Sequence, residues 1–118
     1  MYKLIFYVPP THLATVKQTL FAAGAGRSGL YDHCCWQTLG TGQFRPLPGS
    51  RPFIGEIGRL RQVEEYKVEM LCEQQYLPAA LAALLHSHPY EEPAYEILPL
   101  CDPNLFRLDK VEAESKLG

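Results

Sequence analysis

The sequence of 118 residues lacks a strong excess of charge of either sign. Lys and Arg number 11 and Asp and Glu 13, which gives a formal net charge of -2 at pH 7. Proteins that neutralise nucleic-acid phosphates need clustered basic residues, so this balance argues against a DNA or RNA partner. No apolar run approaches the length of a membrane span, since the N-terminal one covers only Leu4 to Val8. We therefore expect no nucleic-acid partner and no membrane partner.

Cysteines are few and poorly spaced for metal binding. Neither a CxxC pair nor a zinc-ribbon spacing occurs among Cys34, Cys35, Cys72 and Cys101. Cys34 and Cys35 are adjacent and would point to opposite faces of a strand, so they cannot chelate one ion together in regular geometry. The N-terminus shows no secretion signal, and we therefore expect a cytoplasmic chain with reduced, mostly buried thiols.

Familiar catalytic and nucleotide-binding patterns are also missing. The four histidines have no Ser or Asp nearby at a spacing that implies a triad. The segment GAGRSG (residues 24–29) follows an expected helix and matches neither GxGxxG nor a P-loop. Turn glycines explain it better than an anion site near Arg27. We expect no catalytic residues, and the sequence argues more against than for an enzyme.

The apolar pattern of the first half predicts a strand, a helix and a strand. Apart from Lys3, Tyr2 to Val8 are apolar or aromatic, as in a central strand. Apolar residues from Leu13 to Ala23 recur at helical spacing, with Thr11 as the expected N-cap and Gly24 as the expected left-handed residue at the helix end. Leu30 to Thr38 predict the second strand.

The second half repeats this order after a long loop rich in Gly and Pro (residues 40–58), which predicts an insertion or flap. From Glu65 to Glu73 apolar and polar residues alternate, as in a strand with one buried face. Pro89 ends a helix, and Ala94 to Leu100 predict the last strand. The helix shows a leucine stripe formed by Leu77, Leu81, Leu84 and Leu85.

Two strand, helix, strand units most simply form a ferredoxin-like βαββαβ sandwich of the α+β class, a four-stranded antiparallel sheet with two helices on one face. We expect a single domain over residues 1–118, with a core from 2 to 100 and a polar tail from 101 to 118. Aromatic and aliphatic residues also occupy the opposite sheet face, including Ile5, Tyr7 and Leu71. That face is therefore expected to be covered by another subunit.

The segment HSHPYEEPAYEI (residues 86–97) concentrates imidazole and carboxylate groups. One interpretation is a site for a divalent metal ion, zinc or copper, with ligands from His33, His88, Glu91 and Glu92. The strands after His33 and after Glu92 lie on opposite edges of such a sheet, so only a neighbouring subunit can bring these side chains together. The alternative is structural: the segment ends a helix and enters an edge strand.

The long loop is basic although the whole chain is slightly acidic. Arg45 and Arg51 lie in it, and Arg59 and Arg61 follow directly. These residues predict a contact with an effector or a protein partner, and the alternative is a solvated loop that carries scattered charge.

Three stretches carry a resemblance to a known family: GAGRSGLYDHC (24–34), GTGQFRP (40–46) and HPYEEPAYEILPL (88–100). They look like the accessory domain of the Nif-three family, which in larger members is inserted between two lobes and resembles CutA and PII signalling proteins. The resemblance implies a ferredoxin-like fold that assembles as a trimer. The family's dinuclear metal centre and the hydrolase or GTP cyclohydrolase labels belong to the flanking lobes, so no residue here takes those roles.

The sequence therefore supports three functional hypotheses. The first is a stand-alone CutA/PII-like homo-oligomer, most simply a trimer, that acts as a binding or regulatory module and takes a metal ion or small effector in clefts between subunits. The second is a metal-dependent hydrolase-like activity in the same clefts. The third is a structural oligomerisation unit for a separately encoded partner.

Overall fold

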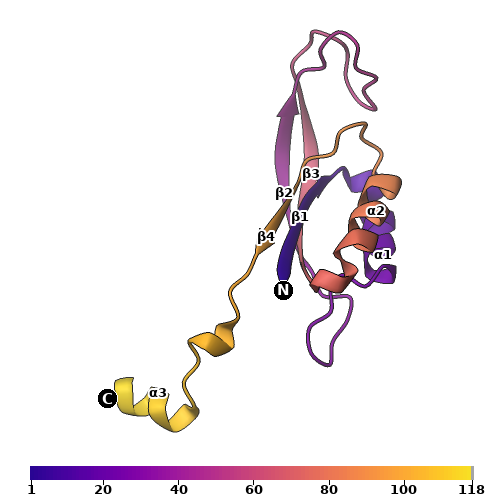
Figure 1. Ribbon diagram of the computed structural model, residues 1–118. Coiled ribbons are helices and arrows are strands. Elements are labelled where there is room, and N and C mark those ends of the chain that lie inside the picture. The colour runs from indigo at the N-terminus through magenta and orange to yellow at the C-terminus, as the bar shows by residue number, and fades with distance from the viewer. Residues whose placement is uncertain (118) are drawn as a thin grey trace.

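The computed structural model describes residues 1–117 and shows one antiparallel sheet covered on one face by two helices (Figure 1). The sheet order is β2-β3-β1-β4, as predicted for a ferredoxin-like sandwich. The strands are β1 (Tyr2–Val8), β2 (Trp36–Phe44), β3 (Arg61–Cys72) and β4 (Tyr95–Pro99). The helices are α1 (Leu13–Ala22), α2 (Leu77–Ser87) and the C-terminal α3 (Lys110–Leu117), with short 3-10 turns η1 (Pro10–His12), η2 (Gln74–Tyr76) and η3 (Pro103–Leu105).

The core lies between α1, α2 and the face of the sheet that they cover. Leu4 on β1 stands opposite Met70 on β3 and Ile97 on β4, so these three side chains point to the same face. Val16 and Leu20 supply the apolar side of α1, and both are fully buried. Each such side chain stabilises the fold by about 1.5–3 kcal/mol through removal of apolar area from water.

Three details of the predicted elements were wrong. The second strand begins at Trp36 and continues to Phe44, because the backbone of His33 adopts a φ of 55° that a strand cannot contain. Thr11 does not cap α1: it lies in η1, and its Oγ1 contacts the ring of the neighbouring His12. Leu85 is half-exposed, because α2 turns Ala80 and Leu84 toward the sheet instead.

The end of α1 is a Schellman motif, as the glycine after the helix suggested. Ala25 N–H donates to the carbonyl of Leu20, and Gly24 N–H donates to that of Phe21. Gly24 has a φ of +106°, and a Cβ built on it would lie 2.6 Å from the ring of Tyr76. A glycine is therefore required here both by conformation and by space.

We expect Gly24→Ala to lower the free energy of unfolding by about 2–4 kcal/mol, because it adds backbone strain and a clash in the packed layer under Tyr76. Gly29 is the matched control, since its φ is +57° and nothing lies within 4 Å of a Cβ there. Gly29→Ala should cost only about 1 kcal/mol. Urea denaturation of both variants measures the difference, and equal costs would contradict the role assigned to the Tyr76 contact.

Two parts of the molecule project from this body (Figure 1). Residues 61–65 of β3 pair only with β2, because β1 ends opposite Tyr66. These residues and their β2 partners, residues 40–44, form a two-stranded arm that ends in the 45–60 loop. The tail after β4 leads away from the sheet and also carries exposed Leu105 and Phe106. The radius of gyration is accordingly 18.1 Å, against roughly 13 Å for a compact chain of about 100 residues.

In the part of the chain that the structure describes, no helix has both the length and the apolar character needed to cross a membrane.

Candidate functional site

His88 is buried, with 6% of its surface exposed, and both of its ring nitrogens are engaged. Nδ1 accepts a hydrogen bond from the backbone N–H of Tyr90 at 3.1 Å. Nε2 lies 2.6 Å from the carbonyl oxygen of Tyr7 and must therefore carry the proton. β4 pairs with β1 only as far as Phe6. The imidazole of His88 therefore donates a hydrogen bond to the next carbonyl of β1, that of Tyr7.

This environment favours the neutral imidazole. Burial lowers the pKa of His88, His12 lowers it further through charge repulsion, and the hydrogen bond to Tyr7 acts in the opposite direction. A metal ion needs a free ring nitrogen, and His88 has none in this conformation. His88 could therefore serve as the predicted ligand only by giving up one of its two hydrogen bonds.

The other predicted ligands are distributed over two places. Glu91 and Glu92 follow His88 on the exposed segment before β4, and the Oε2 of Glu91 accepts the backbone N–H of Arg51 at 2.9 Å. His33 precedes β2, at the opposite edge of the sheet, where its Nδ1 lies 3.1 Å from Oδ1 of Asp32. Among the side chains that the structure describes, no group of three or more His, Cys, Asp or Glu residues could hold a metal ion.

A cavity of about 470 Å³ lies where the 45–60 loop faces the segment before β4. We call it the loop cavity. Its size is within the range of small-molecule sites in proteins. The residues that line it come from β1, β2, β3, the loop and the segment before β4: Tyr7, Gly42, Gln43, Phe44, Pro46, Ser50, Pro52, Phe53, Ile54, Glu65, Tyr90, Glu91, Glu92 and Ala94.

Two residues of the loop, Phe53 and Arg51, make contacts that hold it over this cavity. The ring of Phe53 lies 6.3 Å from that of Tyr90 and 5.4 Å from that of His12, centroid to centroid. Arg51 contributes the hydrogen bond from its N–H to Glu91. The loop is thus attached at neighbouring positions to the segment before β4, and Glu91 has an evident structural role there.

Glu65 is the half-buried acid of the cavity. A Cβ at Gly42 would collide with the Glu65 carboxylate, so the glycine leaves the space that this side chain occupies. Burial, followed by the negative charge of Glu65, raises the pKa of Tyr90 well above its ordinary value. The Tyr90 hydroxyl is buried and has no partner that satisfies hydrogen-bond geometry in the described residues. Tyr90 thus remains a neutral phenol beside an acid.

The loop attachment gives a direct prediction. Glu91→Ala removes the acceptor of the Arg51 N–H, and we expect this amide to exchange with solvent about tenfold faster. Glu92→Ala is the matched control, because Glu92 lines the same cavity without that bond and should leave the rate unchanged. Hydrogen exchange followed by NMR provides the measurement, and unchanged protection in Glu91→Ala would show that the bond does not hold the loop.

The predicted effector residues Arg45, Arg51 and Arg59 are all exposed. Arg59 forms an ion pair with Glu56, with Nε and Oε2 3.3 Å apart. None of the three arginines is among the described residues that line the loop cavity. Their contact with an effector or partner stays a prediction, and it would lie outside the loop cavity.

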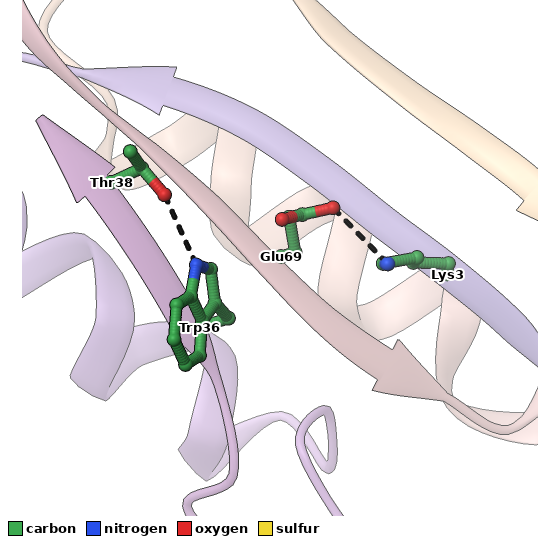
Figure 2. Close-up of polar contacts among 4 residues, drawn as sticks. All are labelled: Lys3, Trp36, Thr38 and Glu69. Carbon is green, nitrogen blue, oxygen red and sulfur yellow. Dashed lines mark hydrogen bonds and ion pairs between the residues drawn. The ribbon is translucent and has the colours of Figure 1, made fainter. Parts of the chain in front are cut away.

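The sheet face away from the helices carries polar contacts as well as apolar side chains (Figure 2). Lys3 Nζ lies 3.1 Å from Oε1 of Glu69, and Trp36 Nε1 donates to Oγ1 of Thr38 at 3.1 Å. Ile5 lies on this face and is only 7% exposed in the single subunit. Trp36 remains 69% exposed, so this edge of the face offers a large aromatic surface.

The sheet order, the two covering helices and the core define a ferredoxin-like α+β domain of the CutA/PII-like class. The PII-like protein CutA from Nostoc sp. PCC 7120 superposes with a TM-score of 0.63 over 94% of this chain and 89% of that one. Its sequence identity is 15%, so the likeness concerns the fold alone.

Sequence relatives give the narrower assignment. The GTP cyclohydrolase 1 type 2 homolog of Halalkalibacterium halodurans is 45% identical over 86% of this chain and 27% of its own length. A Bacillus cereus protein related to NIF3 is 37% identical with a TM-score of 0.74, over 86% of this chain and 26% of that one. No protein-family model matches.

The predicted resemblance to the NIF3 family is thus confirmed: the chain is homologous to one segment of NIF3-related proteins. It spans about a quarter of the length of the curated relatives that it matches, 27% in the first.

Proposed function

We propose that residues 2–100 form a ligand-binding regulatory module and that the loop cavity is its binding site. The observation that carries this proposal is the cavity of about 470 Å³ under a loop attached at Phe53 and Arg51. A ligand that enters there contacts the loop, the sheet and the segment before β4 together. It therefore favours one position of the loop and changes the outer surface that a partner meets.

We also propose that the module acts as a homo-oligomer, most simply a trimer built through its open sheet edges. The edge strand β2 exposes Trp36 and Leu39, and the edge strand β4 exposes Leu98. Association through these edges would pair unsatisfied backbone groups and cover apolar side chains. The predicted cytoplasmic location belongs to the same proposal.

A metal ion is compatible with this assembly only at a boundary between subunits. His33 from one subunit with Glu91 and Glu92 from the next would offer nitrogen and oxygen ligands suited to zinc, whereas copper would favour a further imidazole. His88 could join these ligands only if it gave up its hydrogen bond to the Tyr7 carbonyl or the one from the Tyr90 N–H. The bound ion would link two subunits, and its chemistry would be structural.

The assembly is tested by native mass spectrometry of protein purified without a metal-affinity tag, together with elemental analysis. We expect a trimer, and a boundary site would add about one metal ion per subunit. His33→Ala should remove that metal, whereas His86→Ala, at an exposed helix end, should retain it. A monomer at micromolar concentration would refute the assembly, and a metal-free trimer would refute the ion but leave the module intact.

The binding function is tested with a set of small aromatic fragments of positive, negative and zero charge. We expect at least one class to shift the NMR signals of the Phe44, Phe53 and Tyr90 rings and to raise the unfolding temperature. If no fragment shifts these signals at millimolar concentration, the chain is better described as an oligomerisation unit without a ligand.

A further inference from the structure

We infer that the loop cavity takes an organic cation: an ammonium group attached to an apolar body. This inference rests on the proposal that the loop cavity is a binding site and adds the chemical class of its ligand. It depends on residues of a single subunit and needs no metal ion.

The charge of the cavity is of one sign. Glu65, Glu91 and Glu92 line it, and no Lys, Arg or His side chain is among the described lining residues. Glu65 takes part in no ion pair with any side chain that the structure describes. Glu91 is only partly satisfied, since one carboxylate accepts more hydrogen bonds than the single one from Arg51. An anionic ligand would be repelled here, whereas a cation would be attracted.

Four of the other residues that line the cavity are aromatic. Tyr7, Phe44, Phe53 and Tyr90 supply four rings around the same space as the acids. The negative face of an aromatic ring attracts ammonium groups, and attraction increases where water is displaced. Aromatic rings without carboxylates would accept any apolar molecule, and carboxylates alone would attract any cation. Their combination selects a cation that also has apolar surface.

The position of Glu65 suits it to bind the ammonium group of the ligand. It lies on β3, in the sheet, and is half-buried, whereas Glu91 and Glu92 lie on an exposed segment. Tyr90 lines the same cavity as Glu65. The charged end of a ligand at Glu65 would therefore lie deepest, with its apolar part toward Phe44 and Phe53.

Three matched compounds test the inference: phenethylammonium, phenethyl alcohol and phenylacetate. They share a phenyl ring on a short chain and differ in charge. We expect phenethylammonium to shift the Phe44, Phe53 and Tyr90 ring signals in NMR titrations of the full chain, with an affinity about tenfold above that of the other two. Raising the salt concentration should weaken the binding of the ammonium compound alone.

The charge of Glu65 is tested by Glu65→Gln, which preserves shape. We expect it to weaken phenethylammonium binding about tenfold. The control is Glu64→Gln, because Glu64 is the exposed neighbour on β3 and does not line the cavity. The affinity of the Glu64→Gln variant for phenethylammonium should stay within about twofold of that of the parent. Equal losses in both variants would overturn the role of Glu65.

The outcomes distinguish a failure of the cation inference from a failure of the proposed binding function of the loop cavity. If phenylacetate or the alcohol shifts the same ring signals at least as strongly as the ammonium compound, the cation inference is overturned and the binding module stands. If none of the three compounds perturbs these rings, the inference and the binding site under the loop both fall.

Discussion

Replacing Leu84 with alanine is expected to lower the free energy of unfolding by about 2–5 kcal/mol. Leu84 is fully buried on α2, in the cluster that joins the two helices to the sheet. Truncation removes apolar contacts and leaves a cavity that a packed layer only partly fills. Stability of a chain this small is itself about 5–15 kcal/mol, so a substantial share would be lost. Urea denaturation followed by circular dichroism measures the change.

Leu85 is the matched control, since it adjoins Leu84 on the same helix and is 50% exposed. Leu85→Ala should change the free energy of unfolding by less than about 1 kcal/mol, because alanine's higher helix propensity partly offsets the loss of apolar contacts. A large cost at Leu85 with a small one at Leu84 would mean that α2 is rotated relative to the sheet.

The second large effect is expected at His88. His88→Ala deprives the Tyr7 carbonyl and the Tyr90 N–H of their partners and should cost about 2–4 kcal/mol. His86→Ala is the control, because His86 is exposed in the last turn of α2 and should have little effect. A stability loss at His88 no greater than that at His86 would refute the bridging role.

The same histidine predicts how stability depends on pH. Burial lowers the pKa of folded His88 below the ordinary value of 6.5, so the unfolded chain takes up a proton first as the pH falls. The stability that His88 contributes is therefore complete above pH 6.5 and is lost as the pH falls through the folded pKa. We expect a slope of up to about 1.4 kcal/mol per pH unit in that window. Denaturation at several pH values should show this slope in the parent and a flatter one in His88→Ala.

Local pattern was enough to predict most of the fold. The apolar run of β1 and the alternation of β3 depend on a buried face, and both strands lie at the centre of the sheet. β2 was misplaced because Gly40 and Gly42 look like turn residues. They lie in a strand because β3 pairs with them across the whole arm, and Gly42 makes room for Glu65. A tertiary partner of this kind is not visible in a local window.

The candidate site was only partly predictable. The segment HPYEEP was identified as important, but His88 was interpreted as a possible ligand. Its acceptor is the carbonyl of Tyr7, 81 residues away in sequence, which no spacing rule indicates. Tyr7 was placed on the uncovered face, and the alternation predicted for β3, extended back to Glu65, puts that side chain on the same face. That signal could have suggested a polar site there, although the loop that closes it was visible only in the structure.

The two-stranded arm has a thermodynamic consequence. A hairpin with no third strand beside it is marginally stable alone, so the arm should open and close more readily than the four-stranded part of the sheet. The loop cavity lies along the arm and is lined by Gly42, Phe44 and Glu65 from it. A molecule bound there would add its binding free energy to the closed state, so the lifetime of the arm would report the concentration of that molecule.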